Sequence, residues 1–247
     1  MKPKLAYLDP AFQQWVKVTQ ALPAEQQIEA VSKRLRELNP GFDGKLTGYS
    51  VKGPPKIEGG VVTELGFVAD NVTDISPVQA FAGLKSLQCN GSAFVAGELF
   101  DLSPLRGMAL TALNCNHTKV SDLSPLAGMP LTYLDCIVTK ISDLSPLRGM
   151  PLATLWCSST QVSDLSPLMA MPLRNLSVHT SPVSDLSPLE GCKDLQLLKA
   201  SKTKVTPAQV AALQKVLPNC KIEWDGATKT LLPPGEGARR PDEGAKP

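Results

Sequence analysis

Hydrophobic positions return every 21 residues through the middle of the chain. The four strictest copies of the pattern begin their core with a leucine, at Leu113, Leu134, Leu155 and Leu176. Looser copies cover 63–84 and 85–110, and another begins at Gln196, which gives seven copies in all. A fixed period of this length indicates a repeat protein in which each copy forms one coil of a solenoid.

The pattern inside one copy predicts its local structure. Leu134-Asp135-Cys136 alternates apolar and polar residues, as a short strand does. Successive strands are expected to stack into one parallel sheet, about 4.8 Å apart. Ser145-Pro146-Leu147 indicates a single 3₁₀ turn, with Ser145 as N-cap, Pro146 in the first position and Gly149 ending it.

Two polar columns recur at fixed offsets in the repeat. Hydroxyl residues follow the strand, at Thr118, Thr139, Thr160, Ser181 and Thr203. We expect them to satisfy backbone groups where the chain leaves the sheet. Aspartates precede the helical turn, at Asp74, Asp101, Asp122, Asp143, Asp164 and Asp185. Stacked carboxylates could bind Ca²⁺, but calcium loops need several oxygen ligands around glycines, so we favour hydrogen bonds to nearby backbone N–H groups.

Four cysteines share one inward column of the repeat. The column consists of Phe67, Cys89, Cys115, Cys136, Cys157, Val178 and Ala200. The strand spacing would permit a disulfide, and thiolates bind metals. Because the other members are apolar, we expect free thiols that pack as small hydrophobic groups, without a metal or cofactor. Cys192 and Cys220 lie outside this column, and the repeat assigns them no role.

The segments outside the repeat predict caps at both ends. Residues 10–22 and 23–38 are expected to form a helical hairpin that ends at Asn39-Pro40-Gly41. A short β-excursion follows within 45–62, with Gly59-Gly60 as its turn.

At the other end, Thr206 and Gln209 fit a capping box that opens a helix, and residues 221–224 follow as a last strand. The composition of 225–247, rich in Pro, Gly and charge, is typical of disorder. We therefore expect an N-terminal helical cap over 1–44, a solenoid with its C-terminal cap over 45–224, and a disordered tail over 225–247.

The repeat LxxLxCxxTxVSDLSPLxGMP resembles the leucine-rich repeats of bacterial internalin-like proteins. Residues 10–224 are also similar to the C-terminal segment attached to serine/threonine protein kinases of planctomycete type. The matching strings are ALPAEQQIEAVSKRLRELNPGFDG, NVTDISPV and KVTPAQVAALQKVLPNCKIEW. The resemblance implies a right-handed horseshoe of class α/β and a role in protein interaction, with 47–56 as an insertion. It does not imply kinase activity, because the sequence has no glycine-rich phosphate loop, HRD or DFG motif.

Composition narrows the function further. A net charge of +2 gives no reason to expect nucleic acid or an anionic membrane as partner. The chain lacks an apolar run near the roughly 18 residues of a membrane span, and its first residues lack a signal-peptide core. We expect a monomer in the cytoplasm, where thiols stay reduced, or an extracytoplasmic location if the chain is a fragment of a membrane-anchored kinase.

The outward strand positions form three columns on the concave face of the expected horseshoe. They are Glu64, Ser86, Ala112, Tyr133, Thr154, Asn175 and Leu197; Gly66, Gln88, Asn114, Asp135, Trp156, Ser177 and Lys199; and Val68, Asn90, Asn116, Ile137, Ser158, His179 and Ser201. Tyr133, Ile137 and Trp156 are expected to meet on an otherwise small and polar surface, and Tyr and Trp are enriched at interface hot spots.

We therefore expect a protein-interaction module that binds a partner protein on the concave face. Tyr133, Ile137 and Trp156 would be its apolar contacts, and the polar contacts would be Asp135, Asn175, His179 and Lys199. The alternative is a regulatory or sensor segment of a kinase whose catalytic domain is absent from this chain. Catalysis is not expected, because the two histidines, His117 and His179, lie three repeats apart and no recognised motif supplies a nucleophile.

Overall fold

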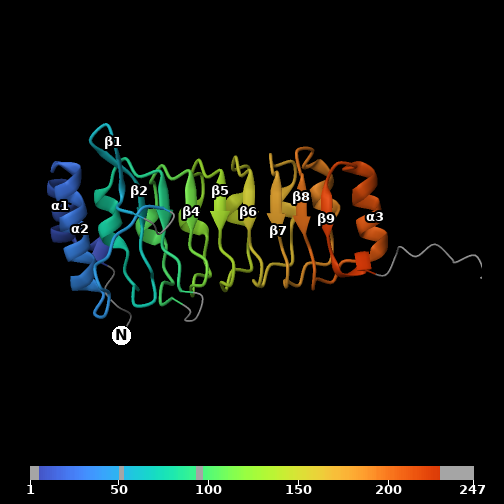
Figure 1. Cartoon of the computed structure of the whole chain (residues 1–247), viewed down its shortest axis with the longest axis horizontal. Coiled ribbons are helices and arrows are strands. Elements are labelled where there is room, and N and C mark those ends of the chain that lie inside the picture. The colour runs from blue at the N-terminus through green and yellow to red at the C-terminus, as the bar shows by residue number, and fades with distance from the viewer. Residues whose placement is uncertain (1–5, 50–52, 93–96, 229–247) are drawn as a thin grey trace, which may run out of the picture.

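The structure, a computed structural model, describes residues 6–49, 53–92 and 97–228. The described residues form one open sheet of nine strands in chain order, β1 to β9, with helices at both ends of an elongated molecule (Figure 1). The predicted leucine-rich-repeat solenoid of class α/β is confirmed.

The strands are short and stack in register. They are β1 Lys56–Glu58, β2 Val61–Gly66, β3 Ser86–Gln88, β4 Ala112–Asn114, β5 Tyr133–Asp135, β6 Thr154–Trp156, β7 Asn175–Ser177, β8 Leu197–Lys199 and β9 Lys221–Glu223. From β2 onward all neighbours are parallel, and Leu134 pairs with Leu113 on one side and Leu155 on the other. β1 returns antiparallel to β2 through Gly59 and Gly60, which have φ of 58° and 79°. The expected turn and the expected stacking of equivalent positions are both confirmed.

A 3₁₀ turn follows each strand from β2 to β7, as the sequence predicts. These turns are Ser76–Ala80, Ser103–Leu105, Ser124–Leu126, Ser145–Leu147, Ser166–Leu168 and Ser187–Gly191. The prediction that Ser145 is the N-cap is wrong, because Ser145 is the first residue of the turn and Leu144 occupies the cap position without a side-chain cap bond. Asp143 supplies the contact instead: its Oδ1 accepts the Ser145 N–H at 2.7 Å and its Oδ2 accepts the Ser145 hydroxyl at 2.7 Å.

The aspartate column has the structural role expected of it. Each of the six aspartates accepts a hydrogen bond from the backbone N–H two residues later. The six acceptors are Asp74, Asp101, Asp122, Asp143, Asp164 and Asp185. These bonds lower the pKa of the Asp143 carboxyl below its usual value, because they favour the charged form.

The hydroxyl column also acts as expected, at the corner where each strand ends. The Thr139 hydroxyl donates to the Cys136 carbonyl at 2.7 Å. The same bond recurs at Thr118, Thr160, Ser181 and Thr203. At this corner the backbone enters the left-handed region, with φ of 52° at Val138. The equivalent residues with positive φ are His117, Ser159, Thr180 and Lys202.

The core lies between the sheet and the 3₁₀ turns. The cysteine column is fully buried in it, together with Phe67, Val178 and Ala200, at no more than 1% exposure each. Burial raises the pKa of the Cys89 thiol to about 12, so this group stays protonated at neutral pH. Cys192 is also buried, and its Sγ donates to the Leu168 carbonyl at 3.3 Å. Cys220 is buried just before β9.

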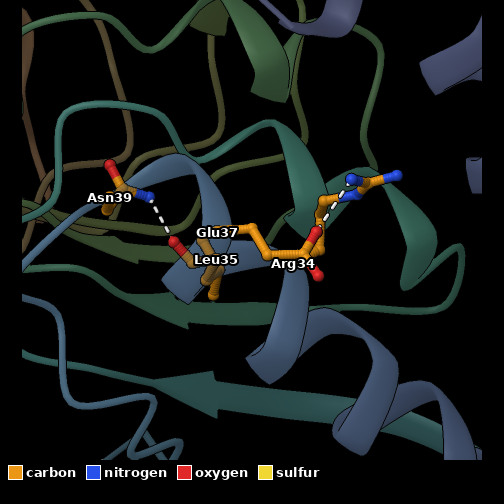
Figure 2. A network of polar contacts seen from close by, with 4 residues as sticks. All are labelled: Arg34, Leu35, Glu37 and Asn39. Atoms are coloured by element: carbon orange, nitrogen blue, oxygen red, sulfur yellow. Dashed lines mark hydrogen bonds and ion pairs between the residues drawn. The ribbon is translucent and has the colours of Figure 1, made fainter.

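The N-terminal cap consists of two helices, α1 Pro10–Gln20 and α2 Ala24–Leu38, so the expected hairpin is confirmed with slightly shorter helices. Asn39 ends α2 and joins the cap to the first coil. Its Nδ2 donates to the Leu35 carbonyl at 2.9 Å (Figure 2) and to the Asp74 carbonyl at 2.8 Å. Its Oδ1 accepts the N–H groups of Thr73 and Asp74. Figure 2 also shows the ion pair between Arg34 and Glu37 of α2, in which 2.8 Å separates nitrogen and oxygen.

The C-terminal cap is α3 Pro207–Val216 followed by β9. The predicted capping box is confirmed, because Thr206 and Gln209 bond each other's backbone N–H reciprocally. A 3₁₀ turn over Asp225–Thr228 continues the structure past the expected start of the tail at 225, and the Asp225 carboxylate accepts the Lys202 N–H. The rest of the expected tail, 229–247, lies outside the described residues.

Candidate functional site

The concave face is the surface made by the three outward columns, and the strand register fixes which of its residues are neighbours. Asp135 on β5 pairs with Asn114 on β4 and with Trp156 on β6. Tyr133 lies two residues before Asp135 on the same strand and therefore points to the same face. The structure thus brings three of the predicted site residues together at the middle of the sheet.

Asp135 is the central charge of this face. Its Oδ1 accepts the Ile137 N–H at 3.1 Å, and its Oδ2 accepts the Asn116 Nδ2 at 2.9 Å. The Asn116 N–H in turn donates to Asn114 Oδ1 at 3.0 Å. Asp135 is only 7% exposed, and this burial raises the pKa of its carboxyl against the opposing effect of both hydrogen bonds and of His117. A carboxylate that was expected to be an open polar contact is therefore a buried one.

The aromatic residues beside Asp135, Tyr133 and Trp156, are both half-buried. Burial and the Asp135 charge raise the pKa of the Tyr133 hydroxyl, and a contact with the Trp156 side chain lowers it. Ile137 is half-buried as well, next to the exposed Val138. The expected apolar group of Tyr133, Ile137 and Trp156 does share one part of the concave face.

A residue outside the repeat also reaches this face, which the sequence did not predict. Thr47 exchanges two backbone hydrogen bonds of 2.7 Å with Gly66. A Cβ on Gly66 would lie 2.5 Å from the Gly48 carbonyl oxygen, so glycine at this concave position lets the segment pass close above the sheet. Tyr49 follows, and its ring lies edge-on to Tyr133 with 6.4 Å between centroids.

The Tyr49 hydroxyl is buried and has no hydrogen-bond partner among the described residues. Its pKa is raised by burial first, and then by Tyr133 and Asp135. The expected insertion over 47–56 therefore contributes a third aromatic ring to the site, while residues 50–52 lie outside the described residues. The only sequence signal was Gly66, the one glycine in the concave columns.

The remaining predicted residues lie farther along the sheet. Asn175 on β7 donates from Nδ2 to the Thr154 hydroxyl at 3.3 Å. His179 follows β7 and is half-buried. Lys199 on β8 is exposed, with its Nζ 3.9 Å from a Glu223 carboxylate oxygen. Since β8 is two strands from β6, Lys199 is roughly 10 Å from Trp156, the nearest ring of the aromatic group. These three residues belong to the same face, but the structure does not bring them to the centre.

The two histidines lie far apart in the described part of the chain. His117 follows β4 and His179 follows β7, three strands apart. Within the same described residues, His, Cys, Asp and Glu do not gather in any group of three that could hold a metal ion.

Comparisons with known proteins bear on the fold. No family model and no curated protein matches the chain. Among solved structures, internalin C2 from Listeria monocytogenes is 22% identical, with a TM-score of 0.50 over 66% of this chain and 81% of that one. Internalin InlF from the same organism is 22% identical, with a TM-score of 0.41 over 66% of this chain and 63% of that one. The functional domain of InlJ, also from Listeria monocytogenes and described as including a cysteine ladder, is 17% identical, with a TM-score of 0.33 over 68% and 57%.

Proposed function

We propose that this chain is a protein-interaction module and that its partner protein docks on the concave face. The observation that carries the proposal is the pair of aromatic rings, Tyr133 and Trp156, with Tyr49 packed on Tyr133, on a face whose other strand positions are mostly small or polar. Trp and Tyr dominate the binding energy of protein interfaces because they remove a large apolar area from water. Ile137 extends the same apolar area.

The scaffold under these rings suits binding of this kind. Tyr133 and Trp156 lie on adjacent strands whose inward neighbours, Leu134 and Leu155, are completely buried. Side chains on such a support lose little freedom when a partner arrives, so more of the contact energy remains as affinity.

The outlying residues fit the rim of a protein-sized contact. Asn175, His179 and Lys199 lie along β7 and β8, one and two strands from Trp156 and up to roughly 10 Å from it. A typical interface covers about 800 Å² on each partner and surrounds an apolar centre with polar residues. We propose that these three residues make such rim contacts.

The class of partner follows from charge and shape. A net charge of +2 gives little attraction to nucleic acid, so we propose a protein partner bound by a monomer of this chain, and no enzymatic activity. In the part of the chain that the structure describes, each helix is too short or too polar to cross a bilayer. A cytoplasmic location remains our proposal on the six free cysteines, all buried.

The second candidate function, a regulatory segment of a kinase, rests on the sequence resemblance of 10–224. A kinase reading frame fused to or adjoining this one would favour it. The experiment below tests the first candidate, the docking surface on the concave face.

Replacing Trp156 by Ala tests the docking surface. We expect the far-ultraviolet circular dichroism to stay unchanged, because Trp156 is half-buried on the surface of the sheet. Binding of a partner captured by the wild-type chain should weaken by at least about 1 kcal/mol, or roughly fivefold. Met169→Ala is the matched control, because Met169 is 61% exposed behind the sheet. Equal affinity of the Trp156 and Met169 variants would refute the proposed surface.

A further inference from the structure

Asp135 differs from Glu64 and Glu223, the acidic residues on β2 and β9 at the two ends of its face. Glu64 Oε1 lies 3.1 Å from the Lys56 Nζ. Glu223 Oε1 lies 2.7 Å from the Lys221 Nζ, with Lys199 also near. Asp135 takes part in none of the ion pairs found between described residues, although it is the most buried of the three. Its hydrogen bonds come from a neutral backbone N–H and a neutral amide.

A carboxylate in this position is unusual, because a buried charge is normally paired with an opposite one. The donors of Ile137 and Asn116 each occupy one carboxylate oxygen, and a carboxylate has about four lone-pair sites. Asp135 therefore keeps capacity for further donors. A partner docked on the proposed surface would lie next to Asp135 and could supply those donors.

The side chains around Asp135 favour one kind of donor. Trp156 lies directly across the strand pair from Asp135, and Tyr133 lies two residues along β5. The faces of Trp and Tyr rings attract cations, and the attraction is strongest for Trp. A carboxylate with aromatic rings on two sides suits a cationic side chain whose charge meets the oxygens and whose flat surface meets the rings.

We propose that the concave face receives an arginine side chain of the partner protein, whose guanidinium pairs with Asp135 and stacks against Trp156 and Tyr133. This inference rests on the proposed function and adds the chemistry of the contact. Arginine fits better than lysine, because its planar guanidinium can donate two hydrogen bonds to one carboxylate and stack on a ring at the same time.

The guanidinium reaches the carboxylate by displacing Tyr49. Asp135 is 7% exposed, so part of its cover has to move. Tyr49 belongs to no strand or helix, and its buried hydroxyl forms no hydrogen bond with the described residues. Moving it therefore breaks no hydrogen bond seen in the described structure, and its hydroxyl regains water.

The test uses peptides as probes for the unidentified partner. A random peptide library is selected on the immobilised full chain, and the tightest binder is synthesised with each arginine changed to citrulline, which keeps the shape but removes the charge. Affinities are measured by isothermal titration calorimetry for the wild type, Asp135→Asn and Glu223→Gln. Glu223→Gln is the matched control, because it removes the same charge from the same face at an acid that already has lysine partners.

We expect the selected peptides to contain arginine. Citrulline at one arginine, lysine at the same position and Asp135→Asn should each weaken binding, citrulline and Asp135→Asn by about tenfold. Combining citrulline with Asp135→Asn should cause little further loss, because both changes remove one contact. Glu223→Gln should bind as the wild type does.

Additive effects of citrulline and Asp135→Asn, equal binding of lysine, or an equal effect of Glu223→Gln would overturn the inference. Peptides without arginine that lose binding on Trp156→Ala would overturn the arginine contact and leave the docking surface standing. Peptides that bind the Trp156→Ala variant as tightly as the wild type, or a selection that yields no binder, would count against the docking surface itself.

Discussion

The hydroxyl of Thr139 holds the corner where β5 ends, and its removal should destabilise the solenoid by a predictable amount. Thr139 is 7% exposed, and its Oγ1 donates to the Cys136 carbonyl at 2.7 Å. Among the described residues, no other group donates a hydrogen bond to the Cys136 carbonyl. Thr139→Val keeps the shape and the β-branching of the side chain and removes only the donor.

The expected size of the effect follows from two opposing contributions. A buried carbonyl that loses its donor costs about 1–3 kcal/mol. A methyl group in place of the hydroxyl buries slightly more apolar surface, which offsets the loss by less than about 1 kcal/mol. We therefore expect the free energy of unfolding to fall by about 1–2 kcal/mol, which lowers the melting temperature by a few degrees.

The measurement is urea denaturation followed by circular dichroism, with two control variants. Thr139→Ser keeps the hydroxyl and should retain most of the stability, because Ser181 forms the same bond in a later coil. Thr132→Val removes a hydroxyl that is exposed and bonded at 3.1 Å to the Thr111 carbonyl, so water can replace it. A Thr139→Val variant within about 0.5 kcal/mol of the wild type, or a Thr139→Ser variant equally destabilised, would refute the reasoning.

Three further substitutions test other features of the molecule. Val138→Asn should raise the free energy of unfolding by about 1 kcal/mol in the same urea assay. A β-branched residue is strained at a φ of 52°, and Asn tolerates that region. A loss of stability would contradict this reasoning. Burial raises the pKa of Asp135 above its value in the unfolded chain, so the folded chain binds this proton more tightly. The folded chain therefore loses stability as the pH rises from the unfolded pKa through the folded pKa of this carboxyl. Asp135→Asn should therefore be more stable than the wild type near pH 7 and lose this advantage near pH 3, and a gain independent of pH would argue against the sign. Tyr49→Phe removes a buried hydroxyl that has no partner among the described residues, so thermal melting should show equal or higher stability, and a clear decrease would reveal a hydrogen bond at that oxygen.

Much of the fold could be predicted because each repeat position occurs several times. Leu134, Cys136 and Thr139 have counterparts at the same offset in neighbouring copies. The position of one strand therefore predicted the register of its neighbour. The N-cap was less certain for a physical reason. Asp143 and Ser145 are both good capping residues, two positions apart, and only the observed backbone of the turn shows that the aspartate accepts the N–H.

The candidate site was predictable only where it lies in the repeat. The columns placed Tyr133 and Trp156 on adjacent strands of one face, where the structure has them, because the strand register alone decides that. They could not place Tyr49, because its segment occurs once and follows no period. The burial of Asp135 was missed for a related reason: it depends on how side chains from several strands and from outside the repeat cover one carboxylate.

Because β2 to β9 stack in unbroken register, distances along the sheet are multiples of one strand spacing, about 4.8 Å. An extra coil inserted after Leu173 would move Lys199 one strand spacing farther from Trp156. The hydrogen bonds within each coil would stay intact. The span between the aromatic centre and the basic end of the face can therefore change by gain or loss of whole coils, but not by intermediate amounts. A lineage of such chains could match partners of different lengths without redesigning any single turn.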